Sequence, residues 1–155
     1  MTELVAGAAA PAFRLPCDGG GSISLADFQG RKLVLYFYPR ADTPGCTREG
    51  QAFSALAGEF AAAGTAVLGV SADPVPAQDA FKAKYRLEIP LASDETHRML
   101  EAYGVWAEKS MYGRKFMGVV RATFLVGADG RLARVWPNVK VDGHAQEVLA
   151  AAQAL

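Results

Sequence analysis

The 155-residue chain lacks several features that would place it in a specialised class of protein. It has no excess of charge, since 16 Lys and Arg balance 16 Asp and Glu, so we expect neither a nucleic-acid nor a membrane partner. No apolar run approaches the roughly 20 residues that cross a bilayer. Met1–Ala10 has no basic start and predicts no signal peptide. Two cysteines are too few for a disulfide framework and favour a reducing, cytoplasmic compartment.

Metal ligands are also scarce. The two histidines, His97 and His144, have no cysteine or histidine partner at metal-binding spacing. Both fall at expected helix starts, where we predict surface positions. The sequence therefore predicts no metal site and no cofactor. Its length suits one core, so we expect residues 1–155 to form a single domain.

The most informative segment connects a predicted strand to a predicted helix. Leu33–Tyr38 is a short run of β-branched, aromatic and other apolar residues, typical of a central strand buried on both faces. Pro39 ends it, because proline has no N–H group for the sheet. Thr43 suits the N-cap of a helix and Pro44 its first position. Cys46 then falls at the third helical position.

A cysteine in the first turn of a helix is chemically unusual. Backbone N–H groups there have no partner within the helix, and the helix dipole is positive at that end. Both favour the thiolate form of Cys46, which is the nucleophilic form. Arg40, Arg48 or an arginine from elsewhere would add to the effect. The alternative is a buried structural thiol, which the strand end, the cap and the first-turn position argue against.

The rest of the chain alternates predicted strands and helices, which indicates an α/β fold with a mixed central sheet and helices on both faces. The helix that begins at Pro44 is expected to stop at Gly64, and Cys17 falls in the turn of an N-terminal β-hairpin. An Asp-Gly turn predicts a second hairpin. Further strands are expected at 66–71, 90–92, 118–120, 123–126 and 132–136, further helices at 78–85, 93–102 and 145–154, and a mobile active-site loop at 109–115.

The pattern Pro39-x-x-x-Thr43-x-x-Cys46 resembles the active-site signature of the peroxiredoxins, which are thiol-dependent peroxidases on a thioredoxin-like fold. Flanking segments resemble the bacterioferritin comigratory (Q-type) subfamily. The similarity runs from about residue 10 to the last helix. It implies a thioredoxin-like domain that reduces hydrogen peroxide and organic hydroperoxides through a cysteine sulfenic acid. The segments that carry it are residues 10–16, 24–30, 36–39, 109–113 and 121–126.

The resemblance also implies roles for individual residues. Cys46 matches the peroxidatic cysteine, and Thr43 matches the hydroxyl that hydrogen-bonds the thiolate and the peroxide. Pro39 matches the proline that shields the pocket from water. Arg121 matches a distant arginine that activates the thiolate, although nothing in the local sequence places it near Cys46. Glu49 matches an acidic position common in the subfamily, which would orient an arginine.

The chain departs from the subfamily in its second cysteine. Many Q-type members carry a resolving cysteine five residues after the first, where Gln51 stands here, and Pro76–Arg86 on the next helix has none. We therefore expect a one-cysteine cycle, in which thioredoxin, glutaredoxin or glutathione attacks the Cys46 sulfenic acid. Resolution by Cys17 stays open, and so does a disulfide between two chains. The resemblance implies a monomer or weak homodimer.

Other thiol chemistries fit less well. A thioredoxin-type oxidoreductase needs a second cysteine at position 49, which is glutamate, and a cysteine phosphatase needs arginine at position 52, which is alanine. A redox sensor that reacts once without turnover would use the same acidic thiol. Repeated consumption of peroxide in the presence of a thiol donor would distinguish a peroxidase from such a sensor.

Overall fold

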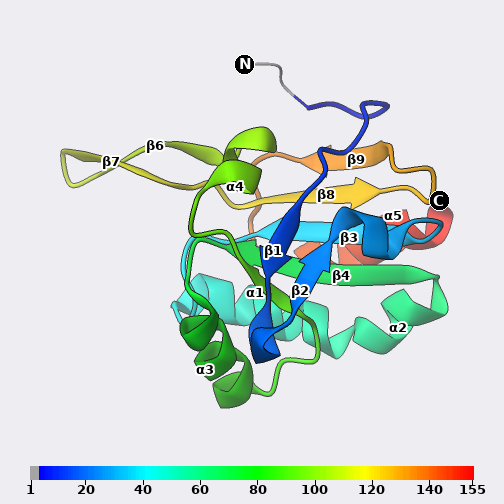
Figure 1. Cartoon of the computed structure of the whole chain (residues 1–155), viewed down its shortest axis with the longest axis horizontal. Helices are drawn as coiled ribbons and strands as arrows, with labels where there is room; N and C mark the ends of the chain where they lie inside the picture. The colour runs from blue at the N-terminus through cyan, green and yellow to red at the C-terminus, as the bar shows by residue number, and fades with distance from the viewer. Residues whose placement is uncertain (1–3) are drawn as a thin grey trace.

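The computed structural model describes residues 4–155 (Figure 1). The first three residues of the Met1–Ala10 stretch, for which the sequence predicts no signal peptide, lie outside the described residues. Among residues 4–155, no helix combines the length and apolar character needed to span a bilayer. The strands are β1 (Arg14–Pro16), β2 (Ser22–Ser24), β3 (Lys32–Phe37), β4 (Thr65–Ser71), β5 (Leu91–Ser93), β6 (Trp106–Met111), β7 (Arg114–Val119), β8 (Ala122–Val126) and β9 (Leu132–Trp136). The α-helices are α1 (Pro44–Ala55), α2 (Ala57–Ala62), α3 (Val75–Tyr85), α4 (Arg98–Ala102) and α5 (His144–Ala154).

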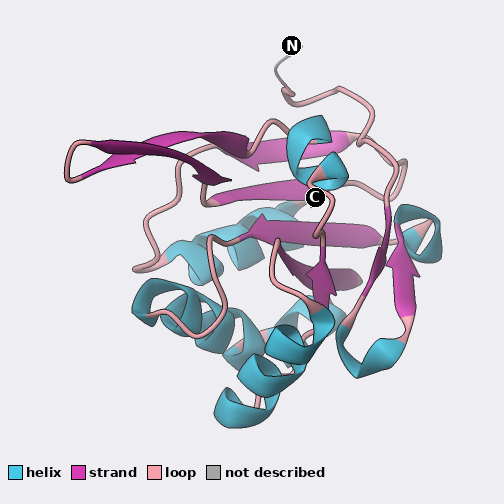
Figure 2. Cartoon of the chain, turned by 60° about the vertical axis from the view of Figure 1, so that its left-hand side comes forward, coloured by secondary structure: helices cyan, strands magenta, loops and turns pink. Residues whose placement is uncertain are grey.

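The central sheet has five strands in the order β5-β4-β3-β8-β9. Figure 2 shows the strands in magenta among the helices in cyan. Strand β3 is parallel to β4 and antiparallel to β8, so the predicted mixed sheet is confirmed. Phe37, the last residue of β3, pairs with Val70 of β4 and with Ala122 of β8. The C-terminal end of β3 therefore lies beside the end of β4 and the beginning of β8.

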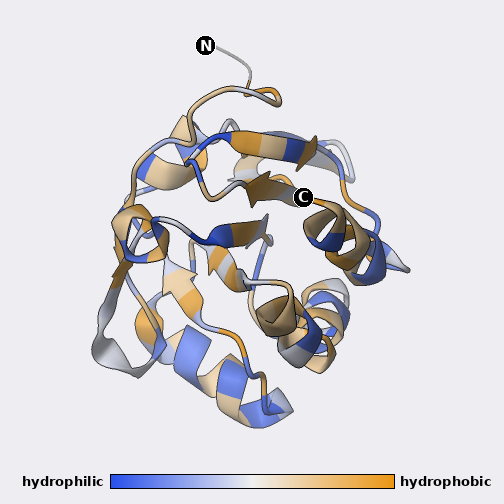
Figure 3. Ribbon diagram, turned by 90° about the vertical axis from the view of Figure 1, so that its right-hand side faces the viewer, coloured by the Kyte–Doolittle hydropathy of each residue, from blue (hydrophilic) through white to orange (hydrophobic). Residues whose placement is uncertain are grey.

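Alternate side chains of β3 point to opposite faces of this sheet. Val34 and Tyr36 pack with residues of α1, α2, α3 and α5, whereas Leu35 and Phe37 pack with α4 and the N-terminal segment. Helices thus cover both faces, as expected of a thioredoxin-like fold. Figure 3 shows helices whose ribbons alternate between hydrophilic and apolar colours, consistent with one face packed on the sheet and one in solvent.

The helix that carries Cys46 is shorter than its apolar pattern predicts. It ends at Ala55, because the backbone of Leu56 departs from helical geometry (φ −99°, ψ 5°). The N–H of Leu56 bonds to the carbonyls of Phe53 and Ser54. A second helix, α2, then begins at Ala57. The predicted stop at Gly64 is therefore wrong for the helix that carries Cys46, and Gly64 instead follows the end of α2, with φ of 65°, which few other residues adopt.

The helix expected to run to Ala102 with Ser93 or Asp94 as its cap is also shorter. Ser93 belongs to β5, and α4 begins only at Arg98. The carboxylate of Asp94 accepts the N–H of Leu100 (2.8 Å), so it caps the helix from a distance. His97 precedes the helix with φ of 65°.

The prediction of a mobile loop at 109–115 is wrong. Strands β6 and β7 form an antiparallel hairpin there, which projects from the body of the protein in Figure 1. Tyr112 and Gly113 form its turn with φ of 51° and 77°, the backbone of a tight hairpin turn. Tyr-Gly is a weak turn signal in sequence, and most side chains of this hairpin are exposed, so no alternating apolar pattern marked the strands. The N-terminal hairpin (β1–β2) and the Asp-Gly hairpin (β8–β9) are confirmed.

Candidate active site

Cys46 lies in the first turn of α1, just beyond the C-terminal end of β3. Thr43 is the N-cap residue, with extended backbone (φ −100°, ψ 156°), and Pro44 is the first helical residue. Only 1% of the surface of Cys46 is exposed. The first-turn N–H groups of a helix have no partner within it, so the sulfur lies in the partial positive charge of the helix N-terminus.

Thr43 occupies the predicted position but does not use its hydroxyl as a cap. The hydroxyl donates to the carbonyl of Arg40 at 2.8 Å, and no side-chain bond to the helix amides is formed. The oxygen therefore keeps its lone pairs for another donor, while its hydrogen is held by the loop. Pro39, which follows β3, is half-buried at the same end of the sheet.

Arg121 reaches Cys46 through the pairing of β3 with β8. It stands one residue before β8, so the antiparallel pairing brings it to the end of β3. One guanidinium nitrogen, Nη2, lies 3.4 Å from the Cys46 sulfur, and Nη1 lies 2.7 Å from Oε1 of Glu49. Burial lowers the pKa of Arg121, but the negative charges of Glu49 and Cys46 outweigh it and raise this pKa. The arginine therefore stays cationic next to the sulfur.

Glu49 is a carboxylate in an almost closed environment, with 1% of its surface exposed. Burial raises its pKa to about 7, against the opposing effect of Arg121. Among the described residues, its second oxygen, Oε2, has no hydrogen-bond partner. The ion pair aims the guanidinium, because one carboxylate oxygen holds Nη1 while Nη2 faces the sulfur.

Sequence reasoning missed two supporting residues. A Cβ atom at Gly45 would lie 3.1 Å from Nη2 of Arg121, so the glycine leaves room for the guanidinium. Asp73 accepts hydrogen bonds from the Ala41 N–H (2.8 Å) and the Ser71 hydroxyl (2.7 Å), which ties the active-site loop to the end of β4. Because β3 and β4 are parallel, a polar residue after β4 was a recognisable candidate for this contact.

Cys17 lies in a different part of the molecule. It forms an isolated bridge with Ala92 of the edge strand β5, on the side away from β4. Neighbouring strands are about 4.8 Å apart, so Cys17 is roughly 14 Å, or three strand spacings, from β3. Cys46 contacts Arg121 on the opposite side of β3. The fold therefore does not bring the two thiols together.

The prediction that both histidines lie at the surface is wrong for His144. It is 5% exposed, and its Nε2 lies 2.8 Å from the hydroxyl of Thr123 on β8. Burial lowers its pKa, so the ring is neutral at pH 7. His97 is half-buried and stacks on Trp106. Within residues 4–155, no three His, Cys, Asp or Glu side chains are grouped to hold a metal ion.

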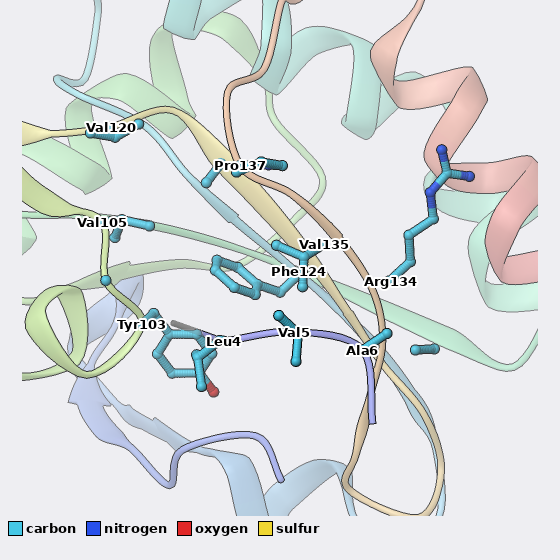
Figure 4. A pocket seen from close by; sticks show the side chains of 13 residues that line it. Leu4, Val5, Ala6, Tyr103, Val105, Val120, Phe124, Arg134, Val135 and Pro137 are labelled. Atoms are coloured by element: carbon cyan, nitrogen blue, oxygen red, sulfur yellow. The ribbon is translucent and has the colours of Figure 1, made fainter. Parts of the chain in front are cut away.

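A cavity of about 580 Å³ lies on the other face of the sheet (Figure 4). Val120, Ala122 and Phe124 line it, whereas Arg121 and Thr123 alternate with them and point to the α1 side. Leu4, Val5 and Ala6 cover one end of the cavity. Its lining is mostly apolar and includes neither Cys46 nor Arg121, so it is separate from the thiol chemistry.

Comparison with known proteins identifies the family. Residues 6–135 match the AhpC/TSA family. The chain is 45% identical to peroxiredoxin Bcp of Xanthomonas campestris over 156 residues, covering 99% of this chain and 98% of that protein. It is 41% identical to peroxiredoxin Bcp of Escherichia coli K12 over 149 residues, covering 96% of each. A trapped intermediate/ligand complex of the X. campestris bacterioferritin comigratory protein, solved for insight into its alkyl peroxide reduction, superposes with a TM-score of 0.90 at 43% identity, covering 96% of this chain and 98% of that one.

These matches agree with the thioredoxin-like sheet and with a buried cysteine held against an arginine at a helix N-terminus. The chain belongs to the AhpC/TSA family and is a peroxiredoxin of the bacterioferritin comigratory (Q-type) subfamily, a thiol-dependent peroxidase.

Proposed function

We propose that this chain reduces hydrogen peroxide and organic hydroperoxides with Cys46 as the peroxidatic nucleophile. The observation that carries the proposal is the 3.4 Å contact between the Cys46 sulfur and Nη2 of Arg121 in the first turn of α1. The alkyl peroxide reduction of the X. campestris relative supports an organic substrate.

The chemistry begins when the Cys46 thiolate attacks one oxygen of the hydroperoxide. A sulfur–oxygen bond forms and the oxygen–oxygen bond breaks. The other oxygen leaves with a proton as water or alcohol, and Cys46 becomes a sulfenic acid. Negative charge moves from sulfur to the leaving oxygen, and the Arg121 guanidinium is positioned along this path. A donor of this kind commonly contributes about 3 kcal/mol to transition-state stabilisation.

Thr43 and Pro39 complete the proposed substrate pocket. Because the Thr43 hydroxyl donates to the Arg40 carbonyl, it would accept the hydrogen of the incoming peroxide rather than donate to it. Such a contact would orient the O–O bond for in-line attack. Pro39 would limit the access of water to the sulfur. Glu49 would hold Arg121 in place.

An external thiol then attacks the sulfenic sulfur, which releases water and forms a mixed disulfide, and a second thiol breaks this disulfide and releases the Cys46 thiol. Both cysteines are free, and Cys17 lies against the edge strand β5 whereas Cys46 lies in the first turn of α1. A disulfide between them would need a rearrangement that brings their Cα atoms within about 7 Å, which supports a one-cysteine cycle. The buried sulfur has to become exposed before another molecule reaches it, so the first turn of α1 would open locally. Thioredoxin, glutaredoxin and glutathione are the candidate reductants, and a monomer or weak homodimer would suit them.

The test is peroxide consumption by the parent protein, Cys46→Ser and Cys17→Ser, with thioredoxin, glutaredoxin and glutathione offered separately. We expect turnover in the parent and in Cys17→Ser, and none in Cys46→Ser. Loss of turnover in Cys17→Ser, with sulfenic acid still formed, would favour an intramolecular Cys46–Cys17 disulfide. A single equivalent of peroxide consumed with every reductant would favour a redox sensor.

A further inference from the structure

Lys109 differs from the other charged residues of the β6–β7 hairpin. It pairs with Phe116 across the two strands and shares a face with Gly118. Glu108, Arg114 and Lys115 are exposed, whereas Lys109 is half-buried. Lysine is rarely buried without a partner, so we expect the ammonium group of Lys109 to have a hydrogen-bond partner.

The ammonium group of Lys109 bonds to the strand that leads to Arg121. Its Nζ donates to the carbonyl of Val119 at 2.8 Å. Val119 is buried, ends β7 and stands two residues before Arg121. A charge-assisted hydrogen bond of this kind is stronger than one between neutral groups. Lys109 therefore holds the chain where it leaves the hairpin and turns toward the Cys46 sulfur.

Gly118 makes room for this arrangement. A Cβ atom at position 118 would lie 2.9 Å from Cδ of Lys109 and 3.3 Å from Cε2 of Phe116. The lysine stem thus crosses the hairpin directly over the glycine, beside the Phe116 ring. Gly118 does not have positive φ, so the backbone itself does not require glycine, and the close approach of the lysine explains it.

The charge of Lys109 also acts on the active site. Burial lowers the pKa of Lys109, the nearby Arg121 cation lowers it further, and Cys46 opposes both. The ammonium is bonded to the carbonyl two residues before Arg121, so its charge is held on the segment that leads to the guanidinium. Together with Arg121 it adds positive potential where a thiolate and a leaving oxygen would carry negative charge.

We propose that Lys109 is a positioning residue of the peroxide-reducing site, which holds the Val119–Arg121 segment with a positive charge bonded two residues before Arg121. Gly118 is part of the same arrangement, because the absence of a side chain at this position leaves room for the methylene chain of Lys109. This inference rests on the proposed function of Cys46.

The main test replaces Lys109 with methionine, which keeps the stem and removes the charge, and with arginine, which keeps the charge. We expect Lys109→Met to form sulfenic acid with hydrogen peroxide about tenfold more slowly at pH 7, and Lys109→Arg to recover most of the rate. Alkylation of Cys46 by iodoacetamide should require a higher pH in Lys109→Met. A merely structural lysine would leave this alkylation profile in place.

Lys115→Met is the matched control, because Lys115 lies on the other face of the same hairpin and its side chain is 77% exposed. It removes the same charge and should match the parent in both measurements. Gly118→Ala is an independent variant that keeps the amine but displaces the stem. We expect it to slow sulfenic acid formation in the same direction as Lys109→Met, with little change in melting temperature.

The outcomes separate this inference from the proposed function. If the parent protein consumes no peroxide, the proposed function fails. If the parent is active and both Lys109→Met and Gly118→Ala react at the parent rate with the parent alkylation profile, Lys109 has no role in the site. Equal slowing in Lys115→Met and Lys109→Met would also overturn the inference, because net charge alone would then explain the effect.

Discussion

The two cysteines of this chain carry the same side chain in two different electrostatic settings. Cys46 lies in the first turn of a helix with an arginine nitrogen 3.4 Å from its sulfur. Cys17 lies in a hairpin turn, where burial and the adjacent carboxylate of Asp18 raise its pKa. Lys82 opposes this increase and Asp79 adds to it. At neutral pH Cys17 is therefore held as the neutral thiol.

This difference teaches that the reactivity of a thiol depends on its neighbours. Two positive elements, the helix N-terminus and Arg121, face Cys46. Carboxylates predominate around Cys17. The thiolate is the reactive form of cysteine, so the contrast supports the proposal that Cys46 is the nucleophile, and we expect Cys17 to be unreactive toward peroxide.

Removal of each sulfur is the most direct test of the contrast. We expect Cys46→Ser to lower the rate of peroxide consumption by about a thousandfold or more, because the variant lacks the proposed nucleophile and the raised pKa of Cys17 keeps the second thiol neutral. Cys17→Ser should stay within about twofold of the parent. Steady-state peroxide assays with a thiol donor measure both. Comparable losses of rate in the two variants would contradict the proposed difference in reactivity between the two cysteines.

Removal of Arg121 should make the setting of Cys46 more like that of Cys17. Arg121→Met deletes the donor and leaves Glu49 buried without its partner, so we expect about 10²- to 10³-fold slower sulfenic acid formation and a loss of about 3 kcal/mol in unfolding free energy. Stopped-flow measurements with hydrogen peroxide and urea denaturation provide the two values. Arg121→Lys serves as the control, since lysine keeps the positive charge but lacks the second nitrogen of the guanidinium, which allows Arg121 to contact Glu49 and Cys46 together. A parent rate in Arg121→Met would contradict the assigned role.

Glu49 gives the Cys46 site a pH dependence that acts on stability. Its carboxyl ionises near pH 4.5 when unfolded and about 7 when folded, so the folded chain binds the extra proton between these values. The unfolding free energy of the parent should therefore fall as pH rises from 4.5 to 7, by a contribution on the order of 3 kcal/mol.

Glu49→Gln removes this titration while keeping an oxygen for Arg121. Relative to the parent, the variant should gain stability as pH rises from 5 to 8. Urea denaturation at several pH values measures the difference between the two proteins, in which other titrating groups largely cancel. A difference independent of pH would show that Glu49 stays ionised throughout.

The smallest predicted effect concerns Cys17. Asp18→Asn removes the neighbouring charge and leaves Lys82 near the sulfur. In a Cys46→Ser background we expect Cys17 to react with iodoacetamide about two- to fivefold faster at pH 8. Asp142→Asn, an exposed change elsewhere, is the matched control. An unchanged rate would mean that burial alone sets the reactivity of Cys17.

Much of the local structure around Cys46 was predictable from sequence. The apolar run 33–38, the proline that ends it and the Thr43-Pro44 pair predict the strand, the turn and the helix start that the structure has. These signals act over a few residues, through hydrogen-bond capacity and backbone preference. The Asp-Gly turn before β9 was predictable for the same reason.

Contacts between distant segments were not predictable from local patterns. Arg121 was expected at the site only through family resemblance, and the β6–β7 hairpin was missed. The direction of the Thr43 hydroxyl depends on the Arg40 carbonyl, and the burial of His144 depends on its contact with Thr123. None of these has a signature in neighbouring residues.

Local signals in the sequence are enough to place the thiol in the first turn of its helix, because caps, prolines and apolar runs act through nearby atoms. The charges that surround that thiol depend instead on how the strands and helices pack. The antiparallel pairing of β3 with β8 brings Arg121 across 75 positions to the Cys46 sulfur, while the edge strand β5 keeps Cys17 apart. Electrostatic interactions depend on distance in space, and only the packed sheet defines that distance.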